Sequence, residues 1–281
     1  MNQYAFYLAM KKKYPEVSIK AAVADKWLSK GQHNGFELNK VFNIAVEEAS
    51  IEDINRLANF YVGSGTVSKI INKYRTHFNS RKTQITFDDP TVYHPEVFQL
   101  DVSRDWFFWG NYVNERYYSD FSNELRSQFV FPDKLDAFNQ KILSEIRITN
   151  SVSIHIRRGD YLEEGFTVLS IDYYKKAIKL IDTKVSNAKY YIFSDDKKYI
   201  NENFNFINNK TIISHNTGEN SYIDMLLMSF CKHNIIANSG FSYWAAWLNS
   251  NNEKIVLAPN ILVPWCKNPV ASSQWQIINC R

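Results

Sequence analysis

The chain has 281 residues, of which 45% are hydrophobic and 22% charged, and this is the composition of an ordinary globular protein. Its formal net charge is +4, and its lysines are dispersed along the sequence. No basic stripe with interleaved aromatic residues stands out, so we expect no nucleic-acid partner. The length allows one large domain or two smaller domains that each bury a core.

Cysteines and apolar runs predict the compartment. Cys231, Cys266 and Cys280 lack metal-ligand spacing, and an odd number of cysteines is typical of a reducing environment. No apolar stretch is long enough to cross a membrane, and the first residues do not resemble a signal peptide. We therefore expect a cytoplasmic protein, with at most peripheral association at the inner face of the membrane.

The first half of the chain has irregular patterning. We expect a helix over residues 4–13, a short strand over 18–23, and mostly helix over 52–71, around Gly63 and Gly65. The chain begins directly in its first helix, whereas a doubly wound domain normally opens with a strand and a phosphate-facing turn. This half is therefore either built differently or lacks a preceding segment.

The second half alternates strand and helix signals, which favours a parallel sheet with helices on its faces. We place the boundary near residues 146–151, which gives domains 1–148 and 149–281. Ser221 and Asp224 resemble a capping box at the start of one helix. The predicted strands are 152–156, 189–193, 211–214, 234–238 and 254–258, and the predicted helices are 171–181, 197–201, 222–232 and 242–250.

Charged residues follow the strand at 152–156 directly, as Arg157, Arg158, Gly159 and Asp160. Buried strands tolerate such charge poorly, so the strand must end there and present the charges at its carboxyl end, where open α/β sheets bind ligands. Arginine offers a planar fork of donors matched to phosphate oxygens, and glycine lets the backbone turn tightly or approach a ligand. The alternative is a surface loop with an Arg–Asp ion pair.

Two further segments place polar groups after predicted strands. Asp195 and Asp196 follow one of them but lack the Asp-x-Asp spacing of metal-dependent sugar transferases, so we expect hydrogen bonding to a base or ribose, with a helix cap as the alternative. The other segment is a helix amino terminus, whose free N–H groups favour a diphosphate, although ordinary N-capping also explains it. It contains Ser239, Gly240, Phe241 and Ser242.

The three segments can converge on one ligand, because parallel strands end along the same edge of a sheet. Together they indicate a nucleotide-diphosphate site neutralised by arginine and a helix terminus rather than by a metal. No P-loop, Gly-x-Ser-x-Gly or His-Glu-x-x-His pattern is present, which disfavours phosphotransferase, esterase and zinc-protease functions.

The run His155-Ile-Arg-Arg-Gly-Asp-Tyr161 resembles the H-x-R-R-G-D-Y motif of bacterial α-1,2-fucosyltransferases of the glycosyltransferase family 11 type. Residues 109–118, 193–196 and 222–248 resemble further blocks of this family, and residues 2–10 resemble the helix that follows its G-G-L-G-N-Q loop. The resemblance covers most of the chain in the right order. It implies an α/β, GT-B-like fold of two Rossmann-like domains, the first of them lacking its first strand and glycine loop.

The resemblance also implies a reaction. It is inverting, metal-independent transfer of L-fucose, with no cofactor, from GDP-β-L-fucose to the 2-OH of a terminal galactose in an oligosaccharide or lipid-linked glycan. A fucosyltransferase of another linkage, or a catalytically impaired nucleotide- or glycan-binding protein, is the alternative. An aromatic segment at 106–118 either contacts the acceptor or forms a buried cluster.

The resemblance gives the site residues their roles. Arg157 and Asp160 are the catalytic candidates: Arg157 contacts the pyrophosphate, and Asp160 activates the acceptor hydroxyl or orders the arginines through an ion pair. Arg158 contacts the second phosphate or has a structural role. His155 and Asp195 lie near the guanine or ribose, with strand-end packing as the alternative for His155. Backbone N–H groups at Ser239, Gly240, Phe241 and Ser242 contact the phosphate, and Gly240 stands where a serine is usual.

Overall fold

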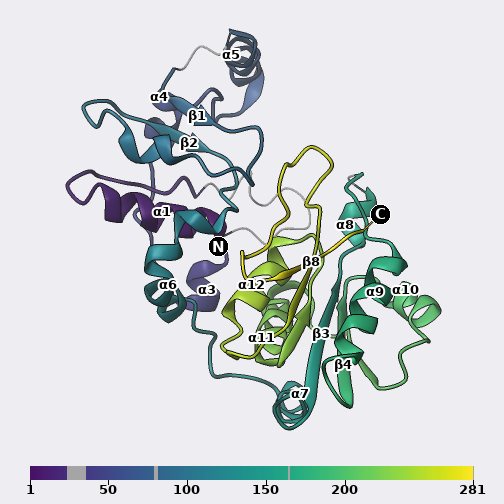
Figure 1. Ribbon diagram of the computed structural model, residues 1–281. Coiled ribbons are helices and arrows are strands. Elements are labelled where there is room, and N and C mark those ends of the chain that lie inside the picture. The colour runs from purple at the N-terminus through teal and green to yellow at the C-terminus, as the bar shows by residue number, and fades with distance from the viewer. Residues whose placement is uncertain (24–35, 79–81, 164, 281) are drawn as a thin grey trace. The chain divides into compact units, whose positions relative to one another are not determined.

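The computed structural model describes residues 1–23, 36–78, 82–163 and 165–280. It divides into two compact units, Met1–Leu125 and Arg126–Arg281 (Figure 1). Helix α7 (Ala137–Ile148) lies before the predicted boundary, but it packs against strand β3 and helix α11 of the second unit. The division into domains 1–148 and 149–281 stays a prediction. In the described part of the chain, no helix is both long and apolar enough to span a bilayer.

The second unit contains a six-stranded parallel sheet with the order β5-β4-β3-β6-β7-β8. Numbered from β3, this is the Rossmann order 3-2-1-4-5-6, in which ligands bind at the carboxyl ends of the strands where the order reverses. That switch point lies between β3 and β6. The strands are β3 (Asn150–Ile156), β4 (Ala188–Ser194), β5 (Lys210–Ile213), β6 (His233–Ile235), β7 (Val256–Pro259) and β8 (Gln276–Ile278).

Helices cover both faces of this sheet (Figure 1). One face of β3 is apolar: Val152, Ile154 and Ile156 pack in a buried cluster with Tyr173 and Tyr174 of α9. The opposite face of β3 carries polar side chains. This alternation holds the strand in one register, because a slip of one residue would exchange the two faces. The helices are α8 (Gly159–Glu163), α9 (Ile171–Asp182), α10 (Lys197–Asn203), α11 (Tyr222–Phe230) and α12 (Gly240–Leu248), with the 3-10 turn η4 (Gly218–Asn220).

The alternation predicted for the second half is confirmed for its five strands and four helices. Strand β8 has no counterpart in the prediction, because it is a short edge strand whose residues are not buried and so show no apolar run. The capping box at Ser221 is wrong: the Ser221 side chain makes no capping bond, and the carboxylate of Asp224 accepts a hydrogen bond from Asn216 instead. The Asn216 amide therefore bonds the carboxylate that the predicted capping box would have used.

The first unit is mainly helical. Its described residues pair two strands in parallel, β1 (Gln84–Thr86) and β2 (Phe107–Trp109). The predicted α/β class with parallel sheets is confirmed in both units. The helices are α1 (Asn2–Lys13), α3 (Leu38–Phe42), α4 (Ile51–Leu57), α5 (Gly65–Phe78) and α6 (Ser122–Gln128), and the 3-10 turns are η1 (Pro95–Gln99), η2 (Glu115–Tyr117) and η3 (Ser119–Phe121).

Two predictions for this unit are corrected. Residues 18–23 form no strand, only an isolated bridge between Ala21 and Glu48. The helix expected over 52–71 is two helices, because α4 ends at Leu57 and α5 begins at Gly65, whose φ of +84° belongs to a turn. Glycine adopts this left-handed conformation without the steric cost that other residues carry.

Candidate functional site

The loop after β3 holds Arg157 between two carboxylates. Strand β3 ends at Ile156 and α8 begins at Gly159, so the predicted end of the strand is confirmed. An Arg157 guanidinium nitrogen lies 2.6 Å from Asp160 Oδ2, and another lies 3.2 Å from Asp195 Oδ2. Burial acts to lower the pKa of Arg157, but the Asp160 hydrogen bond and the charges of Asp195 and Asp160 outweigh it and raise this pKa. Arg157 therefore stays cationic.

Arg158 is attached to helix α10 instead. Its Nε lies 3.1 Å from Asp196 Oδ2, and its guanidinium carbon lies 3.5 Å from the centre of the Tyr199 ring. Asp196 also caps α10 by accepting a hydrogen bond from Tyr199 N at 2.9 Å. The helix-cap alternative thus holds for Asp196. These contacts fit a structural role for Arg158, and its contact with a second phosphate stays a prediction.

Asp195 supports the arginine loop from the neighbouring strand. Its Oδ1 accepts a hydrogen bond from Arg158 N at 3.0 Å, and its Oδ2 pairs with Arg157. A Cβ atom at Gly159 would lie only 3.2 Å from Asp195 Oδ2. The close approach that glycine allows is therefore to this carboxylate. A contact between Asp195 and a guanine or ribose stays a prediction.

The loop between β6 and α12 provides a helix amino terminus at the same edge. The Ser239 side chain caps α12 by accepting from Phe241 N at 3.3 Å. Ser242 is fully buried, and its hydroxyl accepts from Ala237 N at 3.1 Å, which fastens the chain after β6. The capping alternative thus holds for Ser239. Helix α12 has nine residues and no acid in its first turn, so its dipole favours an anion, and the phosphate contact of residues 239–242, Gly240 included, stays a prediction.

Tyr161 joins the two loops. Its hydroxyl donates to Asn238 O at 2.8 Å and also bonds the Ser239 side chain, and burial raises its pKa, so it stays protonated. Sequence reasoning included Tyr161 in the motif without giving it a role. It also gave no role to Asn238, the last residue of the predicted strand 234–238.

Three buried polar atoms along this edge have no hydrogen-bond partner in the described part of the chain. They are His155 Nδ1, Asp160 Oδ1 and Asn238 Oδ1. Burial, with the charge of Arg157, lowers the pKa of His155 to about 3, so the ring is neutral. Its centre lies 5.5 Å from that of the Phe241 ring. Buried polar groups are normally bonded, and leaving one unpaired costs about 1–3 kcal/mol, so these atoms mark a place for a polar ligand.

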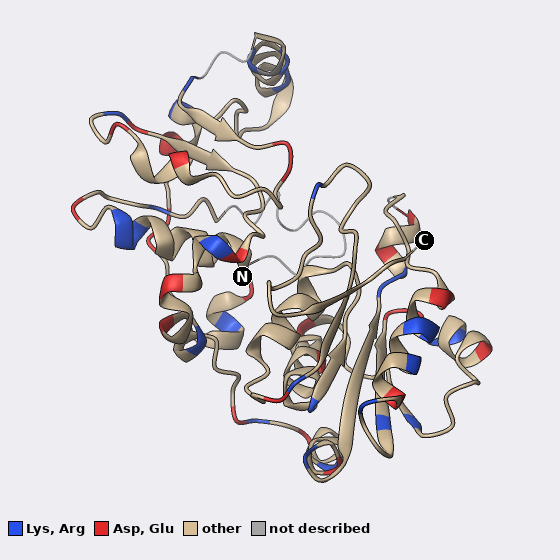
Figure 2. Ribbon diagram, in the orientation of Figure 1, with Lys and Arg blue, Asp and Glu red and all other residues tan. Residues whose placement is uncertain are grey.

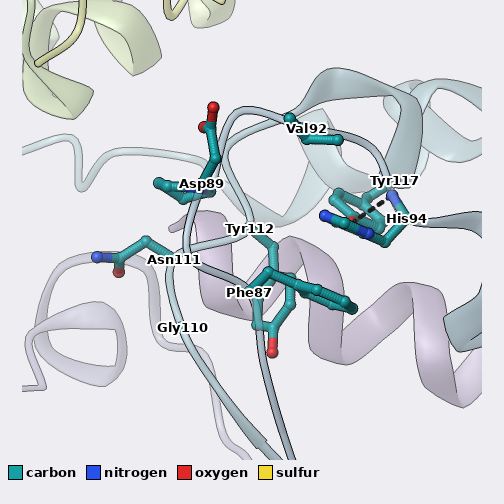
Figure 3. Close-up of a pocket in the computed structure, with 9 residues that line it drawn as sticks. Phe87, Asp89, Val92, His94, Gly110, Asn111, Tyr112 and Tyr117 are labelled. Carbon is teal, nitrogen blue, oxygen red and sulfur yellow. Dashed lines mark hydrogen bonds between the residues drawn. The ribbon is translucent and has the colours of Figure 1, made fainter. Parts of the chain in front are cut away.

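Residues of the aromatic segment at 106–118 line a small pocket in the first unit (Figure 3). There the His94 ring stacks on Phe87 at 3.6 Å, and Tyr117 OH accepts a hydrogen bond from His94 N. Phe107, Tyr112, Tyr117 and Tyr118 are buried, which favours the core interpretation of the segment.

No group of three or more metal-ligating side chains occurs among the described residues. A metal-independent reaction without a cofactor nevertheless stays a prediction.

Comparisons with known proteins identify the family of the chain. The model of a family described as Glycosyl transferase family 11 matches residues 67–274. The chain is 39% identical over 167 residues to an Escherichia coli protein named alpha-1,2-colitosyltransferase, which covers 56% of this chain and 55% of that one. It is 27% identical over 154 residues to rat galactoside alpha-(1,2)-fucosyltransferase 2, which covers 50% and 43%. The chain thus spans about half the length of the curated relatives it matches.

A solved structure of NodZ alpha-1,6-fucosyltransferase, soaked with GDP-fucose, shares 16% identity over 41% of this chain and 43% of that one. Its TM-score of 0.29 is too low to support an argument. The family match, in contrast, covers well over half of the chain and includes all three strand-end segments. The chain therefore belongs to glycosyl transferase family 11.

Proposed function

We propose that the protein transfers L-fucose from GDP-β-L-fucose to the 2-OH of a terminal galactose, with the donor diphosphate bound at the carboxyl ends of β3, β4 and β6. The observation that carries this proposal is the arrangement at the switch point. Arg157, the amino terminus of α12 and three unpartnered buried polar atoms lie on one sheet edge, where Rossmann-type sheets bind nucleotides. The family and the names of the relatives support the same chemistry.

The reaction breaks the bond between the fucose anomeric carbon and the GDP oxygen while the galactose 2-OH oxygen forms a new bond from the opposite side. GDP leaves with a developing negative charge, and fixed positive groups aimed at that charge lower the barrier. Arg157 and the N–H groups at the start of α12 have this role. The hydroxyl proton needs an acceptor within hydrogen-bond reach, and the free Oδ1 of Asp160 is our candidate.

The net charge of the ion-paired residues at this site limits how the donor diphosphate can bind. Two arginines, Arg157 and Arg158, face three carboxylates in the ion pairs of this site, so the cluster carries a net charge of −1. A diphosphate adds further negative charge. Arg157 must therefore exchange a carboxylate partner for a phosphate oxygen when the donor binds, and Asp195, which holds both arginine residues, keeps the loop in place.

A second donor has specific support. The 39% identical relative is named for colitosyl transfer, with the same α-1,2 linkage as the galactoside fucosyltransferase. Colitose is L-fucose without its 3-hydroxyl, so the two sugars differ by one polar group. A site that bonds the 3-hydroxyl rejects colitose strongly, whereas a site that does not bond it accepts both sugars.

The first test is calorimetric titration of the chain with GDP, with UDP and ADP as controls and with a chelator present. Selective GDP binding supports the donor site, and equal binding of all three nucleotides contradicts it. Incubation with GDP-fucose or GDP-colitose and lactose then identifies the donor, and linkage analysis of the product by NMR tests the 2-OH. Another linkage would replace the proposed one, and selective GDP binding without transfer to any galactoside would favour a binding protein.

We further propose a galactose-terminated oligosaccharide or lipid-linked glycan as the acceptor, and a cytoplasmic location at the inner face of the membrane. Synthetic galactosides with a free or a blocked 2-OH distinguish acceptors in the same assay. Loss of product only with the blocked compound is the expected result.

A further inference from the structure

Helix α5 is built with its polar side inward. The Ser68 hydroxyl donates to Gly63 O at 3.0 Å, and the buried Arg75 guanidinium donates to Phe60 O at 2.8 Å. The Asn72 amide bonds both the N–H and the C=O of Tyr61, at 2.7 and 3.0 Å. These three side chains fasten the helix to the backbone of the segment before it. The polar face of α5 is therefore already used for packing.

The opposite face of α5 is apolar and exposed. Val67, Ile70, Tyr74 and Phe78 are 68%, 64%, 60% and 62% exposed. Their spacing of three and four residues puts them on one side of the helix, where Tyr74 and Phe78 have ring centres 4.8 Å apart. We call these four residues the apolar stripe. An amphipathic helix normally buries such a stripe, so this inverted arrangement indicates an apolar partner outside the unit.

Charge around the apolar stripe selects the kind of partner. Lys69 and Lys73 are exposed and precede Ile70 and Tyr74 by one residue, so they lie along one side of the stripe. Helix α5 contains basic residues and no acid (Figure 2). Between Asp53 and Asp88 the sequence contains six lysines and arginines and no aspartate or glutamate, although Arg56 pairs with Asp53 and Asp105 and Arg75 is buried. A partner for this face must therefore combine apolar and anionic groups.

We propose that α5 binds the surface of an anionic lipid bilayer, with its apolar stripe inserted at the boundary between headgroups and acyl chains and with Lys69 and Lys73 on the lipid phosphates. Helices with one apolar face and flanking lysines lie in the plane of such surfaces. Fourteen residues are too few to span the bilayer. A second copy docked by the same face would bring like charges together, which disfavours a two-fold dimer here.

This inference rests on the proposed location at the membrane but not on the proposed donor or reaction, so its failure would leave GDP binding and transfer unaffected. The full chain is sedimented with vesicles of pure phosphatidylcholine or of phosphatidylcholine with phosphatidylglycerol, at low and at high salt. We expect binding to the anionic vesicles, weakened by salt. Lys69→Glu with Lys73→Glu should weaken it at least about 30-fold, because each lysine near such a surface contributes about a fivefold factor.

The apolar stripe is tested by Ile70→Ser with Tyr74→Ser, which should abolish sedimentation with the same vesicles. Val102→Ser with Ile148→Ser is the matched apolar control, because these residues are also exposed, at 55% and 84%, but lie outside α5. Lys141→Glu with Lys179→Glu, on α7 and α9, is the matched charge control. Both control variants should bind vesicles as the unchanged chain does, and thermal melting checks that all variants are folded.

Three results would overturn the proposal. One is equal binding of the unchanged chain to neutral and anionic vesicles, or to neither. Another is a control variant that loses as much binding as the stripe variant. The third is concentration-dependent dimerisation in sedimentation velocity that the stripe variant loses, without any vesicle binding, which would make a second copy the partner of α5.

Discussion

The loop after β3 and helix α5 depart from the usual arrangement of polar and apolar groups in opposite directions. In the loop, Arg157 and Asp160 are largely withdrawn from water and paired with each other. In α5, the stripe from Val67 to Phe78 faces water while Arg75 is buried. The first arrangement places charge where a charged ligand is expected, and the second places apolar surface where an apolar partner is expected. Each departure is therefore informative about what binds.

The two regions also differ in how they are held. Loop residues after β3 are positioned by side chains from a neighbouring strand, such as Asp195, and by Tyr161 bonded to the loop after β6. Helix α5 is held by its own side chains, which bond the backbone of residues 58–63, and by Arg75, whose guanidinium also lies over the Tyr61 ring. A substitution in the loop after β3 should thus change ligand binding, whereas a substitution on the polar face of α5 should change local stability.

The largest expected effect is that of Arg157→Ala. It removes the charge proposed to stabilise the leaving GDP, and loss of one such group typically costs a factor of about 100–1000 in rate. We expect transfer to fall by about 1000-fold and calorimetric GDP affinity to fall with it. Arg157→Lys, which keeps the charge but loses the planar fork, should retain an intermediate activity.

Two further measurements serve as controls for the Arg157 variants. The melting temperature of each Arg157 variant shows whether loss of the ion pairs has unfolded the second unit. Vesicle sedimentation should be unchanged, since α5 lies in the other unit. Turnover by a folded Arg157→Ala chain at the unchanged rate would contradict the catalytic assignment of this arginine.

Asp160→Asn separates the two roles of this carboxylate. If its free Oδ1 accepts the proton of the acceptor hydroxyl, kcat should fall about 100-fold, because an amide is not a base. GDP affinity should stay within about threefold, since Asp195 still pairs with Arg157. Steady-state kinetics and calorimetry measure the two quantities. A weaker GDP affinity with unchanged kcat would instead assign Asp160 to ordering the arginine.

In α5 the expected effect is on stability. Arg75→Met leaves the carbonyls of Ala58 and Phe60 without this donor, and an unpaired buried group costs about 1–3 kcal/mol. Lys73→Met, on the exposed side of the same helix, is the matched control and should stay within about 0.5 kcal/mol. Chemical denaturation measures both. Equal loss in the two variants would show that α5 is not held by its polar face.

Much of the second unit is predictable from sequence. Strands β3, β4 and β7 are almost wholly buried, and the strands of this unit alternate with helices of ordinary length, so the order of elements is visible in the residues themselves. Strand β8 is missed because it is a short, exposed edge strand without an apolar run. In the first unit, Ser18 to Val23 looks like a strand because of its Ile and Val content, yet most of it pairs with nothing in the described structure apart from the Ala21 bridge. β-propensity alone does not supply a partner strand.

The site is predictable in its residues but not in its pairing. The position of Arg157 at a strand end follows from charge after a buried strand. That Arg158 instead stacks on Tyr199, and that Asp195 holds the backbone of Arg158, depends on the register of β3 against β4. Register is a long-range property that one strand does not encode by itself. The role of Tyr161 is hidden for the same reason, since its partner Asn238 lies 77 residues away.

The smallest expected effect concerns Asp224, a partly buried acid that forms no ion pair with a cation among the described residues. At the candidate site Asp160, Asp195 and Asp196 each pair with an arginine. Asp224 instead accepts its hydrogen bond from the amide of Asn216, at 2.7 Å. Burial raises the pKa of Asp224 from 3.8 to about 7, and the Asn216 bond only partly opposes this. The folded state therefore holds the Asp224 proton more tightly than the unfolded state does.

The sign of the pH dependence follows from that difference. Between about pH 4 and pH 7 the folded chain binds more protons at this site, so its contribution to stability is complete below pH 4 and is lost as the pH rises through 7. Asp224→Asn keeps an oxygen acceptor for Asn216 and cannot ionise. The variant should match the unchanged chain near pH 4 and exceed it at pH 8, as measured by denaturant unfolding. The expected excess is about 1–2 kcal/mol, well below the full value of the pKa shift, because the Asp224 side chain is only partly buried and solvent screens its charge. A difference between the two chains that is the same at both pH values would show that Asp224 is ionised throughout, and that burial without a cation does not shift its proton equilibrium.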